Sequence, residues 1–407
     1  MTRNLTCLYT SVVNLMEARM SAPAQLPFEQ THPLRLPPKL HALRSQGGVH
    51  RIRTTLGDEA WLVTEYAQVR RLLGDGRLGL AHPVPEAAAG TGVFGKPVGD
   101  FDTEPADHAR MRSLLLPHFS PKHMRALRPR VDVLVAQLLD ELAEQGPPAD
   151  LHEALALPLP ILVVCELLGV PHEDRDKFRT WISDAFDTRD RARSDRGLGE
   201  LLDYGQRLVA RKRRDPGDDV ISRLCASEDV CDIEASWLSM ALLFAGHETT
   251  MVQIGWGALL LLTNPNQWQA LLDDPGLVEN AVEEILRAPA GGDGGLPRYA
   301  RTDLEIDGVT IPAGDLVLLN NCSANHDPTS FPSPDRVDLT RSAAERLSFG
   351  HGARCCIGAP LARIELQSVF TQLVSRFPTM RLAAYVDELR IRRDALAGGL
   401  VELPVWW

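Results

Sequence analysis

The residues best suited to do chemistry lie in a glycine-rich turn near the C-terminus. The stretch Leu347–Glu365 reads LSFGHGARCCIGAPLARIE, with three glycines, an arginine and two adjacent cysteines ahead of a helical pattern. An accessible thiolate on such a turn can serve as a nucleophile or as a metal ligand. A cysteine nucleophile would need a paired histidine, and none can be placed beside it from the sequence. A buried structural cysteine is a third possibility, so the residue types alone leave the chemistry open.

Three further groups of polar residues fall inside helical patterns. The run Ala245–Thr250, AGHETT, interrupts the longest apolar helix pattern near its middle. Its glycine and threonines could simply weaken the helix without any chemistry. Glu284 and Arg287 lie three residues apart on one helix face, which is the spacing of an ordinary surface ion pair. His108 and Arg112, four residues apart, could equally belong to a solvated face.

The spacing around the second cysteine narrows these possibilities. Phe349-Gly350-x-Gly352-x-Arg354-x-Cys356-x-Gly358 resembles the signature of the cytochrome P450 family, with every position of the pattern filled. The resemblance implies that the Cys356 thiolate is the axial ligand of a haem b (iron protoporphyrin IX). Cys355 falls on a variable position and is expected to be a packed bystander. The glycines let the backbone turn tightly against a flat macrocycle, and a thiolate ligand favours O–O cleavage.

The same resemblance gives roles to the other polar groups. It implies that Glu248 is an acidic relay and Thr249 a hydroxyl, which together help to deliver protons at the haem. Buried haem propionates need cationic partners. The residues implied to bind them are His108, Arg112, Arg298 and Arg354.

A structural triad and part of a substrate pocket complete the implied site. Glu284, Arg287 and Arg336 are implied to brace the loop behind the haem. Leu243 and Ala245 in the central helix are predicted to line the substrate pocket. The resemblance extends over roughly residues 30–405.

Helices must position most of these residues. The segment Ile233–Thr263 is apolar on nearly every face, and the charge at its midpoint would be costly in lipid. It is therefore predicted to be a long buried central helix rather than a membrane span. Alternating patterns predict a β-hairpin over Val49–Thr54 and Glu59–Thr64, and short strands after Pro289. The expected fold class is mainly α with small β-sheets, and the resemblance implies that this is a cytochrome P450 fold. Further helices are predicted over 66–73, 107–117, 122–145, 159–168, 218–225, 266–274, 277–288 and 359–377, with two more within 172–214.

Composition and charge exclude several other classes of protein. The 407 residues carry a net charge of −11, which argues against nucleic-acid binding. Seven cysteines without paired CxxC spacing argue against a disulfide scaffold or zinc finger and fit a cytoplasmic setting. The N-terminus has no apolar run that would suit an anchor. We expect a poorly ordered extension over residues 1–25 and a single domain over 26–407.

The resemblance implies a soluble monooxygenase that inserts one oxygen atom from O2 into a bulky organic small molecule. A tailoring step in natural-product biosynthesis, on a polyketide, macrolide or peptide, is the expected setting. No Rossmann or flavin fingerprint is present, so a separate ferredoxin and ferredoxin reductase are expected to supply electrons to a monomer. The alternatives are a peroxide-using haem-thiolate enzyme, a P450 that catalyses oxidative ring closure or coupling, and a haem-thiolate sensor without turnover.

Overall fold

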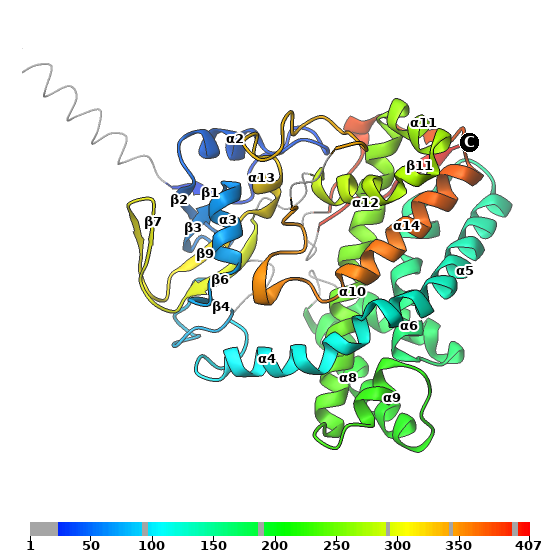
Figure 1. The fold of residues 1–407 in the computed structure, drawn as a ribbon, viewed down its shortest axis with the longest axis horizontal. Helices are drawn as coiled ribbons and strands as arrows, with labels where there is room; N and C mark the ends of the chain where they lie inside the picture. The colour runs from blue at the N-terminus through cyan, green and yellow to red at the C-terminus, as the bar shows by residue number, and fades with distance from the viewer. Residues whose placement is uncertain (1–22, 92–96, 186–190, 290–293, 342–344, 393–397) are drawn as a thin grey trace, which may run out of the picture.

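A single long helix, α10 (Asp232–Leu262), runs through the middle of the computed structural model (Figure 1). Asp232 and Glu234 in its first turn interact favourably with the positive end of the helix dipole. Most side chains from Ala235 to Leu261 are buried, which confirms the predicted central helix. In the part of the chain that the structure describes, no helix is long and apolar enough to cross a membrane.

The structure describes residues 23–91, 97–185, 191–289, 294–341, 345–392 and 398–407. Helices fill one side of the molecule, and most strands lie on the other (Figure 1). The other α-helices in the described residues are α2 Pro38–Ser45, α3 Tyr66–Leu73, α4 Glu104–Leu115, α5 Pro121–Gln145, α6 Pro158–Leu168, α7 Arg175–Ala185, α8 Arg191–Arg214, α9 Val220–Cys225, α11 Pro265–Asp273, α12 Val278–Arg287, α13 Asn321–Asn325 and α14 Ala359–Arg376.

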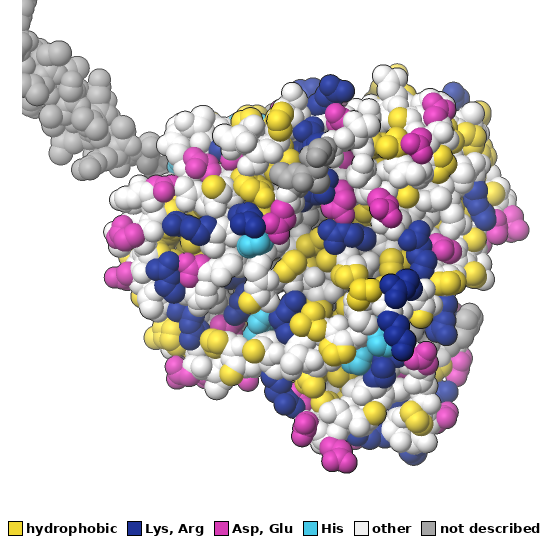
Figure 2. Space-filling view, in the orientation of Figure 1, with side chains coloured by type: hydrophobic (Ala, Val, Ile, Leu, Met, Phe, Trp, Pro, Cys, Tyr) yellow, Lys and Arg dark blue, Asp and Glu magenta, His cyan; other side chains and the backbone are white. Residues whose placement is uncertain are grey.

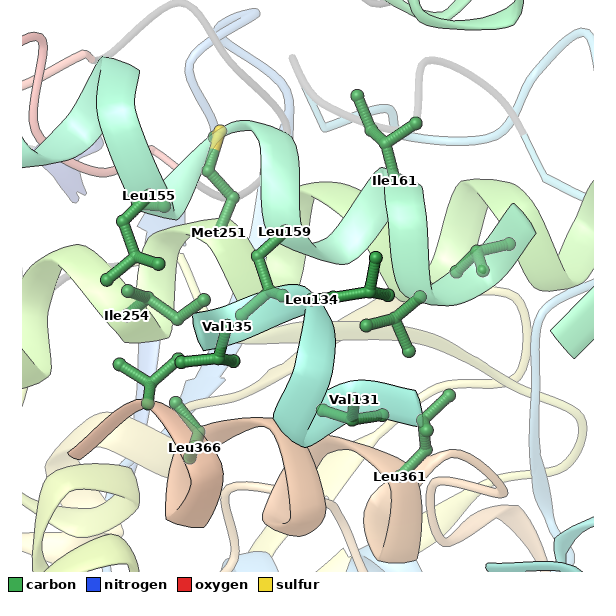
Figure 3. Close-up of a cluster of buried hydrophobic side chains, with 14 of the residues drawn as sticks. Val131, Leu134, Val135, Leu155, Leu159, Ile161, Met251, Ile254, Leu361 and Leu366 are labelled. Atoms are coloured by element: carbon green, nitrogen blue, oxygen red, sulfur yellow. The ribbon is translucent and has the colours of Figure 1, made fainter. Parts of the chain in front are cut away.

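The largest core lies where α5, α6 and α14 pack around α10. Figure 3 shows aliphatic side chains from all four helices, and from the π-helical turn His152–Ala156 before α6, gathered in one cluster. Each such side chain contributes about 2 kcal/mol when it is fully buried. The labelled members are Val131, Leu134, Val135, Leu155, Leu159, Ile161, Met251, Ile254, Leu361 and Leu366. This core fixes the position of α14 relative to α10.

The strands form three sheets. The first has the order β1-β2-β3-β9-β6-β4, the second β10-β11-β5 and the third β7-β8. In the first sheet β6 runs antiparallel to β9, which pairs Arg298 with Val317. The strand bounds are β1 Ala24–Gln25, β2 Val49–Arg53, β3 Glu59–Val63, β4 Leu78–Gly79, β5 Ala149–Asp150, β6 Leu296–Ala300, β7 Leu304–Ile306, β8 Val309–Ile311, β9 Leu316–Leu319, β10 Arg381–Leu382 and β11 Pro404–Trp406.

Most predicted elements are present, and the predicted hairpin is formed by β2 and β3, which pair antiparallel from Val49 with Val63 to Arg53 with Glu59. Two short helices were not predicted. Helix α2 spans only eight residues and has a weak apolar stripe, and α13 spans five. Of the expected N-terminal extension 1–25, residues 1–22 lie outside the described residues, whereas Ala24–Gln25 pair with β2. The boundary expected at residue 25 therefore falls inside the first sheet.

The contact between α10, α12 and α14 gives a stability prediction. A Cβ at Gly257 would lie 2.5 Å from the Phe370 ring and 2.6 Å from the Ile285 side chain. Gly257→Ala should therefore lower the free energy of unfolding by about 2 kcal/mol, because the packed helices must move apart. Gly199→Ala in α8 is the control, since nothing lies within 4 Å of its added Cβ. Urea unfolding should show the control equal to or more stable than wild type. A wild-type midpoint for Gly257→Ala would contradict this packing.

Candidate active site

The loop before α14 is shaped by two glycines with left-handed backbone. Gly350 has φ 73° and Gly352 has φ 71°, a region that residues with a Cβ rarely adopt. A Cβ at Gly352 would also lie 2.8 Å from the backbone of Gly74, at the end of α3. The N–H of Cys356 donates to the carbonyl of Phe349 at 2.8 Å and closes the turn. We call the segment Leu347–Gly358 the Cys loop.

The two cysteines of the Cys loop differ in exposure. The Cys356 side chain is exposed, whereas Cys355 is half-buried. Although Cys356 is exposed at the surface of the loop, protein atoms packed around it remove part of the solvent from its thiol and raise the pKa, and the backbone N–H groups of Gly358 and Ala359 oppose that rise. These N–H groups point at the sulfur, as they would at a thiolate. A coordinating metal deprotonates a thiol outright, so the raised pKa does not oppose ligation.

A stripe of exposed residues interrupts the buried surface of α10. Ala241, Ala245 and Thr249 are exposed although most of their neighbours are buried. Their spacing of four places them on one side of the helix. Open space therefore lies along this side, and the two alanines keep it wide. The Thr249 hydroxyl donates to the carbonyl of Ala245 at 2.8 Å, which leaves its oxygen lone pairs available to that space.

Two predicted residues of α10 do not lie on this stripe. Leu243 is 0% exposed inside the main core, so its prediction as a pocket residue is wrong, whereas Ala245 lies on the stripe. Glu248 is 2% exposed and lies about 100° around the helix from Thr249. Its carboxylate belongs to the buried face next to the stripe.

The four predicted propionate residues influence one another electrostatically. Burial and the nearby Arg354 guanidinium lower the pKa of Arg298 to about 10. Burial, Arg354 and Arg112 lower the pKa of His108. Arg112 also donates from Nη1 to the carbonyl of Cys355 at 2.7 Å. Side chains from α4, β6 and the Cys loop therefore create one strongly positive region beside the cysteines.

Glu284 is the centre of a buried group of charges, and its third member differs from the prediction. Its carboxylate accepts from Arg287 Nε and Nη2, both at 2.8 Å. A second arginine, Arg341, forms an ion pair with Glu284, with 3.3 Å between its Nε and Glu284 Oε2. The predicted Arg336 side chain is 72% exposed and lies 3.9 Å from Asp338 instead. Arg336 takes part only through its backbone carbonyl, which accepts from Arg341 at 2.8 Å.

This group connects to the Cys loop through backbone contacts. Arg287 Nη1 donates to the carbonyl of Asn325 at 3.0 Å. The Asn325 side chain accepts from the N–H of Leu347 at 2.9 Å. The Ser348 hydroxyl donates to the carbonyl of Leu286 at 2.6 Å. Helix α12 therefore supports the start of the loop that presents Cys356.

Comparison with known proteins decides the family. A family model described as cytochrome P450 matches residues 178–382. Pentalenolactone synthase of Streptomyces exfoliatus is 43% identical over 392 residues, covering 94% of this chain and 98% of that protein. The chain belongs to the cytochrome P450 family. Mycinamicin IV hydroxylase/epoxidase of Micromonospora griseorubida is a second P450 relative, 38% identical over 95% of this chain and 99% of its own length.

Solved structures of P450s confirm the fold. The mixed-function P450 MycG superposes with a TM-score of 0.88 at 38% identity, covering 95% of this chain and 100% of that one. The substrate-free P450 PimD, a polyene macrolide antibiotic pimaricin epoxidase, gives 0.87 at 39% identity with the same coverage. This chain is accordingly a P450 monooxygenase, a haem-dependent oxidoreductase that uses O2, an organic substrate and redox partners.

The residues of this P450 fit a haem on three independent grounds. An exposed thiol lies on a turn whose N–H groups point at the sulfur. A positive region beside it requires an anionic partner, since like charges repel most strongly where solvent is excluded. A stripe of small residues on α10 leaves space for a flat group. A porphyrin with two carboxylates satisfies all three.

Three charged residues of the site were not predicted from the sequence. Arg341 lies five residues beyond the predicted Arg336, in the same irregular segment. Glu104 lies one helical turn before His108, but the helix was predicted to begin at Asp107. Arg301 follows β6 and contacts Glu104. The sequence shows only that these segments are rich in charged residues. It does not indicate which of the charged side chains point into the protein.

The two arginines near Glu284 give a direct test. Arg341→Ala should lower the free energy of unfolding by about 2 kcal/mol, because it removes a hydrogen bond to a buried carboxylate. Arg336→Ala should change it by less than about 0.5 kcal/mol, as expected for an exposed side chain. Urea unfolding followed by circular dichroism measures both. A larger loss of unfolding free energy for Arg336→Ala than for Arg341→Ala would favour the predicted triad with Arg336.

Proposed function

We propose that this P450 inserts one oxygen atom of O2 into a bulky organic small molecule during natural-product biosynthesis. Polyketides, macrolides and peptides are the substrate classes. The exposed stripe Ala241, Ala245 and Thr249 carries the proposal, because it combines small exposed side chains, which would admit a ligand close to the helix, with a hydroxyl. Further support comes from the relatives, which include pentalenolactone synthase, mycinamicin IV hydroxylase/epoxidase and a polyene macrolide epoxidase.

In this proposal the chain supplies the setting for a haem b. When bound, the haem supplies the oxygen-activating chemistry, and a thiolate ligand strengthens it. Cys356 provides that thiolate, and the loop N–H groups tune its donor strength. His108, Arg112, Arg298 and Arg354 bind the two propionates, because their positive region lies beside the Cys loop.

Thr249 and Glu248 handle protons in this proposal. The Thr249 oxygen can accept a hydrogen bond from a group in the open space while its own hydrogen points to Ala245. Glu248 lies about 100° around the helix from Thr249, on the buried face next to the stripe. A change of its rotamer carries a proton from the buried face to the Thr249 side. The pair therefore connects the exposed side of α10 to its buried face.

Removing the Thr249 hydroxyl tests this role. With O2 and reductant, Thr249→Val should form product at least about tenfold less efficiently per reductant consumed, because general acid catalysis is lost. Thr249→Ser, which keeps a hydroxyl, should remain near wild type. The substrate comes from a spectral binding screen of macrolide and peptide ligands, and product and hydrogen peroxide are quantified together.

Two outcomes of that experiment would replace the proposal. Equal efficiency for valine and serine would remove Thr249 from proton delivery. Wild-type turnover with hydrogen peroxide alone, at the rate seen with O2 and reductant, would favour the peroxide-using alternative. Product mass separates oxygen insertion from ring closure or coupling, since only insertion adds one oxygen atom.

We also propose that a ferredoxin, reduced by its reductase, docks on the face that carries the Cys loop, α5 and α14. Lys and Arg side chains gather over this face (Figure 2). Lys122 and Arg125 on α5 are exposed there. Arg112 and Arg354 point inward to Cys355 and Glu104, and Arg363 pairs with Glu283. Lys122 and Arg125 are therefore the better candidates for contact with an acidic partner. A cytoplasmic, monomeric, single-domain enzyme completes the proposal.

Charge reversal tests this docking face. Lys122→Glu combined with Arg125→Glu should raise the KM for ferredoxin by about tenfold at low salt, and the difference should shrink as salt screens the charges. Arg35→Glu with Lys39→Glu, two exposed cations at α2, is the matched control. Steady-state reduction kinetics measure both pairs. Equal effects of the two pairs would place the docking face elsewhere.

A further inference from the structure

Glu104, the first residue of α4, is a nearly buried carboxylate beside the positive region. Its side chain is 7% exposed. Oε1 forms an ion pair with Arg354 of the Cys loop. Oε2 lies 3.4 Å from Nη1 of Arg301, the residue that follows β6. Both oxygens therefore have a cationic partner from a different segment.

Arg301 and the Glu104 side chain are both held in place by neighbouring residues. Arg301 Nη2 donates to the carbonyl of Phe101 at 2.7 Å, and its guanidinium stacks 4.0 Å from the Phe101 ring centre. Gly79 lies so close that a Cβ there would be 2.7 Å from Glu104 Oε2. The N–H of Leu80 lies 3.5 Å from Oε1. Glu104 thus has little freedom to turn away.

The three segments that meet at Glu104 are the same three that carry the proposed propionate residues. Helix α4 carries His108 and Arg112, β6 carries Arg298, and the Cys loop carries Arg354. Gathering these cations costs Coulomb energy. A carboxylate at their junction offsets part of that cost, and it raises the pKa of both Arg298 and His108 against the stronger opposing effects.

We propose that Glu104 is a positioning residue for the haem. It holds Arg354 and Arg301 so that the cations of α4, β6 and the Cys loop converge on the haem carboxylates, and it adds a negative charge at that edge. Arg354 has five N–H donors, so the bond to Glu104 leaves others for a propionate. The inference rests on the proposed function of Arg354, and its test is chosen to separate the two.

The test measures haem retention and reduction potential of the loaded enzyme. Glu104→Gln should release haem to an excess of apomyoglobin about tenfold faster, the size expected for losing one charge-assisted hydrogen bond. Its midpoint potential should rise, because a negative charge near the haem opposes addition of an electron. Arg301→Gln should also speed haem release, and the double variant should lose haem no faster than Glu104→Gln alone.

Glu234→Gln is the matched control. Glu234 pairs with Arg110 of α4 at 2.7 Å but lies outside the positive region, so haem release and potential should stay at wild type. Wild-type or slower release from Glu104→Gln would overturn the proposal and show that Glu104 competes with the haem for Arg354. Additive effects of Glu104→Gln and Arg301→Gln would overturn it as well.

Arg354→Gln separates this inference from the function on which it rests. Faster haem release from Arg354→Gln with wild-type release from Glu104→Gln would reject the role of Glu104 alone. Wild-type release from Arg354→Gln would reject the propionate role of Arg354 and, with it, the inference. Faster release from both variants, with a raised potential for Glu104→Gln, supports both.

Discussion

A buried carboxylate with two arginines, Glu284 with Arg287 and Arg341, is the interaction on which the site depends. Removing Arg287, which donates two hydrogen bonds of 2.8 Å to Glu284, would break the closest buried ion pair of the group, and such a loss costs about 3–5 kcal/mol. The group persists because backbone carbonyls and N–H groups of the following segment satisfy the remaining donors and acceptors. Asn325, whose carbonyl accepts from Arg287, also accepts from the N–H of Leu347 through its side chain, so the start of the Cys loop is tied to these buried charges.

Buried charges also organise the proposed haem site, but there the positive charges outnumber the negative ones. Around Glu284 the charges are matched within the protein, whereas the region of Arg112, Arg298 and Arg354 contains more positive charge than Glu104 neutralises. Burial already lowers the pKa of Arg298 to about 10. In the function proposed above, the two carboxylates of a haem would relieve this imbalance. The first group therefore supports the fold, whereas the second is proposed to be completed by the cofactor.

The sequence is most informative where function depends on local spacing. Cys356 is predicted from the glycines within a few residues of it, and two of these glycines have the left-handed backbone that favours glycine. The sequence is insufficient where contacts between distant segments determine which residue enters the site. Arg336 and Arg341 are both plausible partners of Glu284 by type, and only the path of the irregular segment selects Arg341. In α10 both Leu243 and Ala245 were predicted to line the pocket, but Leu243 is buried in the main core, because a helix that is apolar all round has no stripe in its sequence that marks the exposed side.

The central claim is that Cys356, and not its neighbour, is the haem ligand. The most direct measurement is the absorption spectrum of the reduced carbon-monoxide complex in Cys356→Ala and Cys355→Ala, each loaded with haem. The red-shifted band that marks a thiolate ligand should be lost in Cys356→Ala and retained in Cys355→Ala. Loss of that band in Cys355→Ala, with retention in Cys356→Ala, would contradict the assignment.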